Sequence, residues 1–331
     1  MGTSRLSPAG LDLPNLEREA SRLIKQGIAP ATAHTYRAGT TAYTNFCNRF
    51  NFALLPASED QLILFVADLA QTKAYSTIKV YLAAVRHLHI IHNFGNPLEG
   101  KLKLDLTLKG TRRDKPRAVN SRLPITPLIL RRVKNVLDGE ESYSSITLWA
   151  VMCTAFFGFM RSGEFTVKSK SEYNPAKRLS LSDVAMDNHE APTLIKLTLR
   201  YSKTDQFGLG ADIFLSRNDT PICPVQAMVK YLKARGSSEG VLFIDERKSP
   251  LTKQRLSQDL NCTLMKAKID PSHYKTHSFR IGAATTAAAC GIPDSTIKML
   301  GRWSSNAFQV YLQTPAEKLV EIAAAMGKSL L

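Results

Sequence analysis

The sequence lacks an apolar stretch long enough to cross a membrane. Its longest apolar run, Ile146 to Met160, contains two threonines and a glycine and stops at Arg161, whereas a membrane-spanning helix needs about 20 apolar residues. We therefore expect this run to be a buried helix in a protein with no membrane association. No signal peptide opens the sequence, which predicts an intracellular protein.

Cysteines are few, and nucleotide and metal motifs are lacking. The five cysteines are odd in number and widely spaced, so we expect a reducing compartment and no disulfides. Gly208 and Gly210 lack the third glycine of a dinucleotide loop, and Gly327-Lys328-Ser329 lacks the upstream glycine of a phosphate-binding loop. Of the neighbouring histidines only His89 and His92 share a helix face, with no cysteine or carboxylate nearby. We predict no nucleotide, no cofactor and no metal, and a DNA-facing or core helix at these histidines.

Acidic residues are the minority among the charged ones. There are 44 lysines and arginines against 28 aspartates and glutamates, a net charge of +16. Residues 1–118 hold 16 basic and 9 acidic side chains, so both halves share the excess. This balance indicates a polyanionic partner that both halves could grip. A basic surface that only maintains solubility is an open alternative.

The apolar pattern predicts a mainly α protein with a small β-sheet. Residues 1–14 are expected to be a disordered N-terminus. Residues 15–100 show helical periodicity, including a capping box at Ser58 and Gln61, and indicate an all-helical domain of about four helices. Its helices and the mixed helix and strand pattern that follows suggest two domains for 331 residues.

Residues 101–122 are predicted to be an exposed basic linker between the domains. They carry eight basic and two acidic side chains, and Gly110 and Pro116 are expected to interrupt any helix. The linker could lie along a phosphate backbone, or it could be a solvated tether with no partner. The candidate DNA-binding residues are Lys101, Lys103, Lys109, Arg112, Arg113, Lys115 and Arg117.

Residues 123–331 are predicted to be an α+β domain. Strand patterns occur at 178–184, 193–201 and 211–215, and turn residues between the last two indicate a hairpin. Helices are expected at 225–234, 256–268, 280–289 and 294–300. A short amphipathic helix is expected at 315–327, packing on a neighbouring protomer or on its own domain.

Four separate segments carry side chains that suit phosphodiester chemistry. His277 and Arg280 are three residues apart, so on a helix both can address one phosphate. Tyr311 is the candidate nucleophile, and with an ordinary pKa near 10 it needs a cationic pocket or a base. Arg161 ends the apolar run, and Glu164 one turn later can hold it in place, although a purely structural pair is the alternative. Lys203, at the tip of the expected hairpin, could protonate a leaving oxygen.

In this order, Arg161 with Glu164, Lys203, His277-x-x-Arg280, a Leu-Gly-Arg-Trp segment and Tyr311 resemble the tyrosine recombinases, the lambda-integrase-like site-specific recombinases. The resemblance implies a helical, SAM-like core-binding domain followed by the catalytic domain. It also implies that Arg161 and Arg280 clamp the scissile phosphate, that His277 helps proton transfer, that Lys203 is the general acid and that Tyr311 becomes joined to the DNA 3′-phosphate.

One position departs from the family pattern. In many members a histidine or tryptophan lies nine residues before the tyrosine, where this sequence has Arg302, and Trp303 lies eight residues before Tyr311. We favour Trp303 for this position, with Arg302 as the alternative. The sequence from Gly301 to Ser305 is most similar to that of eukaryotic mobile-element recombinases of the Crypton and DIRS-like kind.

The sequence therefore predicts a metal-independent enzyme that cuts and rejoins double-stranded DNA, as a dimer to tetramer on DNA, for a mobile element. A nuclear location is inferred from the DNA substrate and the eukaryotic resemblance, although no clear import signal is present. The open alternatives are a type IB topoisomerase-like enzyme and a domesticated, non-catalytic DNA-binding protein.

Overall fold

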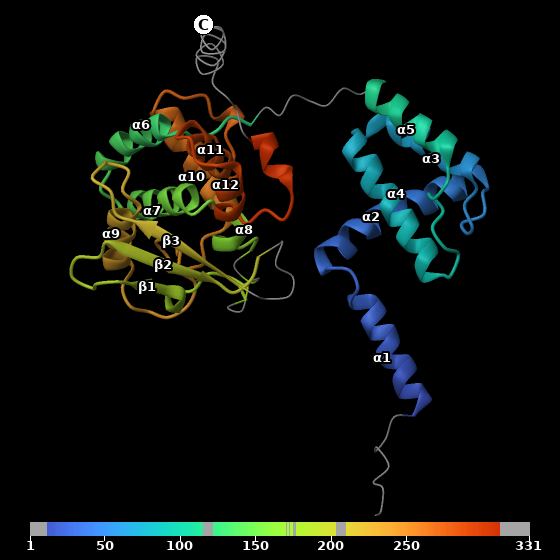
Figure 1. Ribbon diagram of the computed structural model, residues 1–331, viewed down its shortest axis with the longest axis horizontal. Helices are drawn as coiled ribbons and strands as arrows, with labels where there is room; N and C mark the ends of the chain where they lie inside the picture. Colours follow the sequence, from blue (N-terminus) through green and yellow to red (C-terminus); the bar gives the residue numbers. More distant parts are fainter. Residues whose placement is uncertain are drawn as a thin grey trace, which may run out of the picture. The chain divides into compact units, whose positions relative to one another are not determined.

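The computed structural model describes residues 12–114, 122–169, 171, 173–174, 177–202 and 210–311. The chain divides into two compact units, residues 1–119 and 120–331, each with its own hydrophobic core. The predicted fold class, mainly helical with a small β-sheet, is confirmed (Figure 1). Among the described residues, no helix has both the length and the apolar character needed to span a bilayer.

The first unit is entirely helical in its described part. Its core lies between its second, third and fourth helices, with the side chains of Tyr43, Phe65 and Leu82 buried at its centre. His89 belongs to this core, because its Nδ1 lies 2.8 Å from the carbonyl oxygen of Val85 and its Nε2 accepts a hydrogen bond from the Ala57 amide. The helices are α1 (Leu13–Gln26), α2 (Pro30–Phe50), α3 (Glu59–Thr72), α4 (Tyr75–Ile91) and α5 (Leu102–Asp114).

Helix α5 corrects the predicted linker at 101–122. Leu104 and Thr111 are buried and Leu108 packs against the core, so a face repeating at helical spacing holds this segment against α3. The Glu59 carboxylate accepts hydrogen bonds from the amides of Lys103 and Leu104, which otherwise lack helical partners. The prediction was wrong because the many charges hid the short buried stripe of Leu104, Leu108 and Thr111, and Gly110 lies on the exposed side of the helix.

The second unit surrounds one central helix, α7 (Tyr143–Phe157), which is mostly apolar and is buried from Thr147 to Phe156. The expectation of a buried helix for the apolar run is confirmed. The other elements are α6 (Pro127–Asp138), α8 (Ser162–Phe165), η2 (Leu181–Asp183), β1 (Val184–Met186), β2 (Leu194–Leu199), β3 (Ala211–Ser216), α9 (Pro224–Arg235), α10 (Lys253–Lys266), η3 (Pro271–His273), α11 (Ser278–Ala289), α12 (Asp294–Leu300) and η4 (Asn306–Tyr311).

The three strands form an antiparallel sheet in the order β1-β2-β3 (Figure 1). The predicted hairpin is confirmed, because Leu199 at the end of β2 pairs with Ala211 at the start of β3. The strand predicted at 178–184 was wrong. Asp183 caps the Ser180 amide and pairs with Arg200, so that segment turns through η2 before β1 begins at Val184.

Candidate active site

The site is built where the chain leaves α7. Phe159 has φ of 49° and Arg302 has φ of 55°, left-handed conformations that cost non-glycine residues free energy. Phe159 lies in the connection between α7 and α8, and Arg302 lies just after α12. We call the place where these two segments meet, formed by Phe159, Gly301 and Arg302, the corner. Strained backbone concentrated in one place is often maintained for function, and here it surrounds the predicted arginines.

Arg280 lies at the centre of this corner. It stands in the first turn of α11 and is 1% exposed. Its guanidinium donates to the carbonyl oxygens of Phe159 and Gly301, and its Cζ lies 4.1 Å from the centroid of the Trp303 ring. These contacts join α11 to the segment before Arg161 and to the segment after α12.

Helix α11 can reach this position because of Gly282. A Cβ at Gly282 would lie 1.9 Å from the carbonyl oxygen of Ile125. The backbone of 125 also donates to the carbonyl oxygen of Ser278 at 3.0 Å. The close approach of these two backbone segments therefore fixes the position of α11, and with it the position of Arg280 in the core.

Arg161 and Arg302 share the buried carboxylate of Glu164. Arg161 Nη1 donates to Oε1 at 3.0 Å, and Arg302 Nη2 donates to Oε2 at 3.0 Å. Arg161 Nη2 also donates to the carbonyl oxygen of Arg302 at 3.4 Å. Glu164, only 4% exposed, thus fixes two guanidinium groups at once. The predicted Arg161–Glu164 pair is present.

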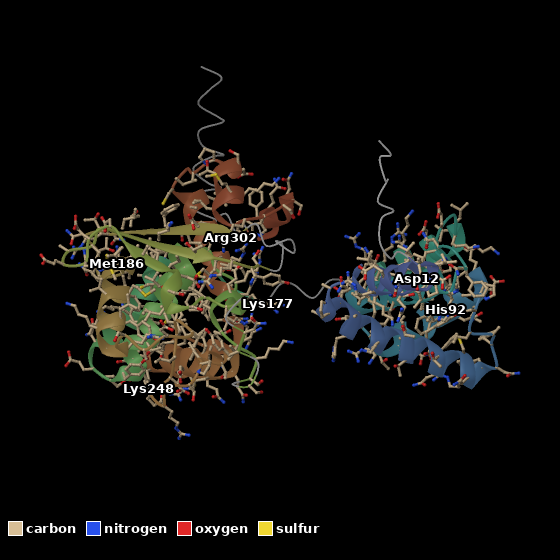
Figure 2. The ribbon with its side chains drawn as sticks, turned by 90° about the horizontal axis from the view of Figure 1, so that it is seen from below. Asp12, His92, Lys177, Met186, Lys248 and Arg302 are labelled. Carbon is tan, nitrogen blue, oxygen red and sulfur yellow. The ribbon has the colours of Figure 1, made fainter. Side chains whose placement is uncertain are left out.

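Arg302 points into the protein. Its guanidinium donates to the carbonyl oxygens of Gly158 and Phe159 at 3.2 and 3.3 Å. Burial lowers the pKa of Arg302 and the nearby Arg161 adds to this effect, while the Glu164 carboxylate opposes it. Figure 2 labels Arg302 in the second unit. These contacts give it a different place from Trp303, which packs edge-on against Phe159 with 6.3 Å between ring centroids.

His277 immediately precedes α11 as its N-cap residue. Burial is the main reason that its pKa falls to about 4, and the positive charges of Arg280, Arg122, Arg161 and Lys253 lower it further. The imidazole is therefore neutral at physiological pH and can accept a proton. Lys253, at the start of α10, was not identified from the sequence, because nothing in its local pattern connects it with His277.

The nucleophile candidate lies at the end of η4. This segment packs against α11, and its Phe308 is buried with its ring 5.6 Å from that of Trp303. The backbone of Tyr311 is described, but its side chain lies outside the described residues. Lys203, Lys115, Arg117, residues 1–11 and the helix expected at 315–327 lie outside them too.

The stem of the hairpin reaches the same corner. Ser202 and Gly210, which flank the segment containing Lys203, line a hollow together with Arg302, Trp303 and Ser304. The hollow therefore lies beside the aromatic ring that stacks on Arg280. The described stem of the hairpin therefore ends beside the predicted site.

The candidate DNA-binding residues of the first unit were expected on an exposed linker, but those that the structure describes lie on or next to helix α5. Lys103, Lys109, Arg112 and Arg113 are exposed on α5, and Lys101 is partly exposed just before it. They lie on a helix packed against the core, so their spacing is fixed by that helix.

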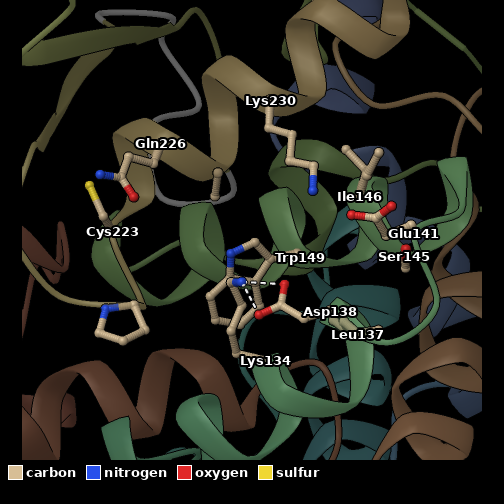
Figure 3. A pocket seen from close by; sticks show the side chains of 12 residues that line it. Lys134, Leu137, Asp138, Glu141, Ser145, Ile146, Trp149, Cys223, Gln226 and Lys230 are labelled. Atoms are coloured by element: carbon tan, nitrogen blue, oxygen red, sulfur yellow. Dashed lines mark hydrogen bonds and ion pairs between the residues drawn. The ribbon is translucent and has the colours of Figure 1, made fainter.

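A separate pocket lies between α6, α7 and α9, at the opposite end of α7 from the corner (Figure 3). Lys134 lies 5.7 Å from the centroid of the Trp149 ring and pairs with Asp138, so the pocket's own side chains occupy part of it. None of the predicted site residues lines it. Among the described residues there is also no cluster of three histidine, cysteine or carboxylate groups that could hold a metal.

Comparison with known proteins agrees with this geometry. Residues 177–317 match the phage integrase family, a range that includes His277, Arg280, Trp303 and Tyr311 but not Arg161. An integrase/recombinase xerD homolog of Selenomonas ruminantium is 24% identical over 300 residues, covering 88% of this chain and 83% of that protein. The chain is thus similar to phage integrases and to an integrase/recombinase.

Solved structures share the fold at low identity. A lambda integrase dimer bound to a COC′ core site matches with a TM-score of 0.62 at 15% identity, covering 91% of this chain and 95% of that chain. The Tn1549 transposon integrase in complex with transposon right end DNA matches with a TM-score of 0.62 at 13% identity, covering 93% and 98%. XerH recombinase bound to difH substrate matches with a TM-score of 0.59 at 16% identity, covering 88% and 78%.

Proposed function

We propose that this protein is a site-specific DNA recombinase that cuts and rejoins strands through a covalent 3′-phosphotyrosyl link at Tyr311. One observation carries the proposal. Arg161 and Arg280 are 119 residues apart, yet both are fixed to the corner formed by Phe159, Gly301 and Arg302. We propose that these two guanidinium groups each donate to a non-bridging oxygen of the phosphodiester.

Each remaining residue has a part in the proposed mechanism. Arg161 and Arg280 neutralise the charge that develops on the phosphate. His277 is neutral at physiological pH because its pKa is about 4. The negative charge of a bound phosphate raises that pKa, so that His277 accepts the proton of the attacking phenol or passes it on. Lys203 protonates the leaving 5′-oxygen, and Trp303 holds the Arg280 guanidinium flat. One phosphodiester is exchanged for another of similar energy, so we propose a reaction without nucleotide, cofactor or metal.

We propose that the substrate is double-stranded DNA bound by both units. The net charge of +16 supports this, and two of the similar structures are DNA complexes, one of a lambda integrase dimer and one of a transposon integrase. Assembly of two to four copies on DNA, with a contribution from residues 315–327, belongs to the same proposal.

The biological setting is proposed from the sequence. The sequence from Gly301 to Ser305 supports a recombinase of a eukaryotic mobile element of the Crypton or DIRS-like kind. A nuclear location follows from that setting and from a DNA substrate. Localisation of a tagged chain by microscopy in a eukaryotic cell tests this part separately from the chemistry.

The test of the chemistry is covalent trapping. The chain is incubated with a pool of duplexes that carry randomised sequences and a nick beside the candidate cut position, so that a cleaved end fragment diffuses away. Adducts that survive denaturing detergent are isolated and their DNA is sequenced. We expect the adducts to share one sequence and to map to Tyr311 by peptide mass spectrometry.

The matched controls are Tyr311→Phe, which should give no adduct, and Tyr143→Phe at the distant end of α7, which should trap as well as the original chain. Adducts undiminished in Tyr311→Phe, or their absence in every chain, would contradict the proposal. A strand-exchange assay beside a plasmid-relaxation assay separates a recombinase from a topoisomerase-like enzyme, since only the recombinase joins strands of two different duplexes.

A further inference from the structure

Residues 177–183, which we call the brace, contact the helix that carries Glu164. Arg178 Nη1 donates to the carbonyl oxygen of Gly163 at 2.6 Å, and the amide of the next residue donates to the carbonyl oxygen of Glu164 at 3.4 Å. Both acceptors lie in α8, whose Glu164 carboxylate holds Arg161. One side of the brace is therefore fixed to the helix that positions Arg161.

The brace also contacts the stem of the hairpin. The Asp183 carboxylate, whose side chain is only 3% exposed, pairs with Arg200 at 2.6 Å. Lys177, labelled in Figure 2, has its Nζ 5.5 Å from the centroid of the Tyr201 ring. Arg200 and Tyr201 directly follow β2, and Ser202 after them lines the hollow beside the corner. The brace thus joins the hairpin stem to α8.

The middle of the brace is anchored in the core of the second unit. Leu179 is 2% exposed, and its carbonyl oxygen accepts a hydrogen bond from the Leu242 amide at 2.9 Å. The Leu181 amide donates to the carbonyl oxygen of Gly240, also at 2.9 Å. Because the backbone is held on both sides of Ser180, the two contact sides of the brace keep a fixed separation.

We propose that the brace positions the general acid of the reaction, acting through Arg200 and Tyr201. This inference rests on the proposed function, in which Arg161 binds the phosphate and Lys203 protonates the leaving oxygen. In that step the phenol oxygen bonds to phosphorus, the bond from phosphorus to the 5′-oxygen breaks, and the Lys203 ammonium gives that oxygen a proton. Lys203 follows Tyr201 by two residues in the sequence, so holding the stem against α8 limits the distance between the acid and the phosphate.

Two substitutions loosen the brace without touching the reacting atoms. Tyr201→Leu removes the ring under Lys177 and leaves the net charge of the protein unchanged, so phosphate attraction is preserved. Asp183→Asn removes the charge that holds Arg200 but keeps an oxygen for the Ser180 amide, which Asp183 accepts at 2.8 Å. Circular dichroism of each variant checks that it is folded.

A leaving group that needs no proton separates the positioning of the acid from any other loss. A duplex with sulfur in place of the bridging 5′-oxygen releases a thiolate, and a thiol with a pKa near 8.5 ionises far more readily than a sugar hydroxyl. Single-turnover cleavage is measured on the oxygen and sulfur forms of the sequence recovered by trapping. We expect Tyr201→Leu and Asp183→Asn to cleave the oxygen duplex about 5-fold more slowly and the sulfur duplex at the original rate. Tyr201→Phe retains the ring and should recover the oxygen rate.

The matched control is Phe214→Leu, the same kind of change at an exposed ring on β3, which should leave both rates unchanged. A selective loss in Phe214→Leu equal to that in Tyr201→Leu would show that any change in the hairpin has this effect and would overturn the proposal. Equal slowing of both duplexes by the two brace variants, or slowing of neither, would also overturn it.

Two reference chains distinguish failure of this inference from failure of the proposed chemistry. Sulfur should restore cleavage by Lys203→Ala but not by Arg161→Ala, because Arg161 acts on the phosphate itself. If sulfur restores Lys203→Ala and gives no selective effect in the brace variants, the brace is refuted and the acid remains assigned. If sulfur does not restore Lys203→Ala, the assignment of the acid is refuted and the brace with it.

Discussion

The guanidinium of Arg280 lies 4.1 Å from the centroid of the Trp303 indole ring. This stack joins a buried cation to the aromatic residue that directly follows Arg302. Because cation and ring are both largely removed from water, the interaction is worth more than at an exposed site.

Replacing Trp303 should therefore affect DNA cleavage more than it affects DNA binding. We expect Trp303→Ala to lower the trapping rate by about 100-fold, because Arg280 loses the surface that orients it, and to destabilise the fold by about 3 kcal/mol. Trp303→Phe keeps a flat ring and should recover most of both losses. Trapping time courses and urea unfolding measure the two effects, and equal losses for both variants would contradict this account.

Removing the Glu164 carboxylate should release both arginines. Glu164→Ala leaves two largely buried guanidinium groups without their shared anion, and breaking a buried pair costs about 3–5 kcal/mol. Glu164→Asp retains the charge at a shorter reach and should lose less. Urea unfolding followed by circular dichroism checks the order of stability, original chain above Asp above Ala. Wild-type stability in Glu164→Ala would show that the carboxylate contributes nothing to the corner.

The close approach at Gly282 predicts a loss of stability on adding a single methyl group. Gly282→Ala places a Cβ against the Ile125 carbonyl oxygen, so we expect a destabilisation of about 1–3 kcal/mol as α11 is displaced. Gly163→Ala is the control, because a Cβ there meets no atom within 4 Å. Thermal melts of the two variants should differ clearly; similar melting temperatures would contradict the packing described.

At Gly110 in α5 we expect the opposite effect, a gain of stability on adding a methyl group. A Cβ at Gly110 meets nothing within 4 Å in a helix interior, and alanine is favoured over glycine there by about 1 kcal/mol. Gly110→Ala should therefore raise the free energy of unfolding of the first unit. A destabilised variant, measured by urea unfolding, would argue that residues 102–114 are not helical.

His277 makes stability depend on pH in a defined window. Its folded pKa is about 4, below an unfolded value of about 6.5, so the unfolded chain binds the proton first as the pH falls. Stability should be unaffected above pH 6.5 and should decrease between pH 6.5 and 4, by about 3 kcal/mol at most. His277→Asn cannot titrate and should lack this part of the decrease. Urea unfolding of both chains at pH 7 and pH 4.5 provides the comparison.

Sequence patterns predicted the elements whose apolar spacing is regular. The buried helix at Ile146 to Met160 and the hairpin of β2 and β3 followed from local composition. Helix α5 was missed because its apolar stripe is short and charge dominates the segment. The strand predicted at 178–184 was misplaced because the ion pair of Asp183 with Arg200, which favours a turn there, depends on residues 17 positions apart.

The site was only partly accessible from the sequence. The order of Arg161, His277 and Arg280 suggested a shared phosphate, but motif spacing could not assign Arg302 and Trp303 to different places. That difference depends on the left-handed backbone of Arg302 and on Glu164, which lies 138 residues earlier. The contribution of Lys253 to the charge around His277 arises from tertiary packing alone.

The carbonyl oxygen that Arg280 contacts at Phe159 belongs to the main chain, and every amino acid supplies the same atom. Divergence at position 159 can therefore change the side chain without removing this acceptor. Arg161 also donates to a main-chain carbonyl, that of Arg302, but its ion pair relies on the Glu164 carboxylate, which a single codon change can delete. Mutation is therefore expected to remove the partner of Arg161 more often than the partner of Arg280.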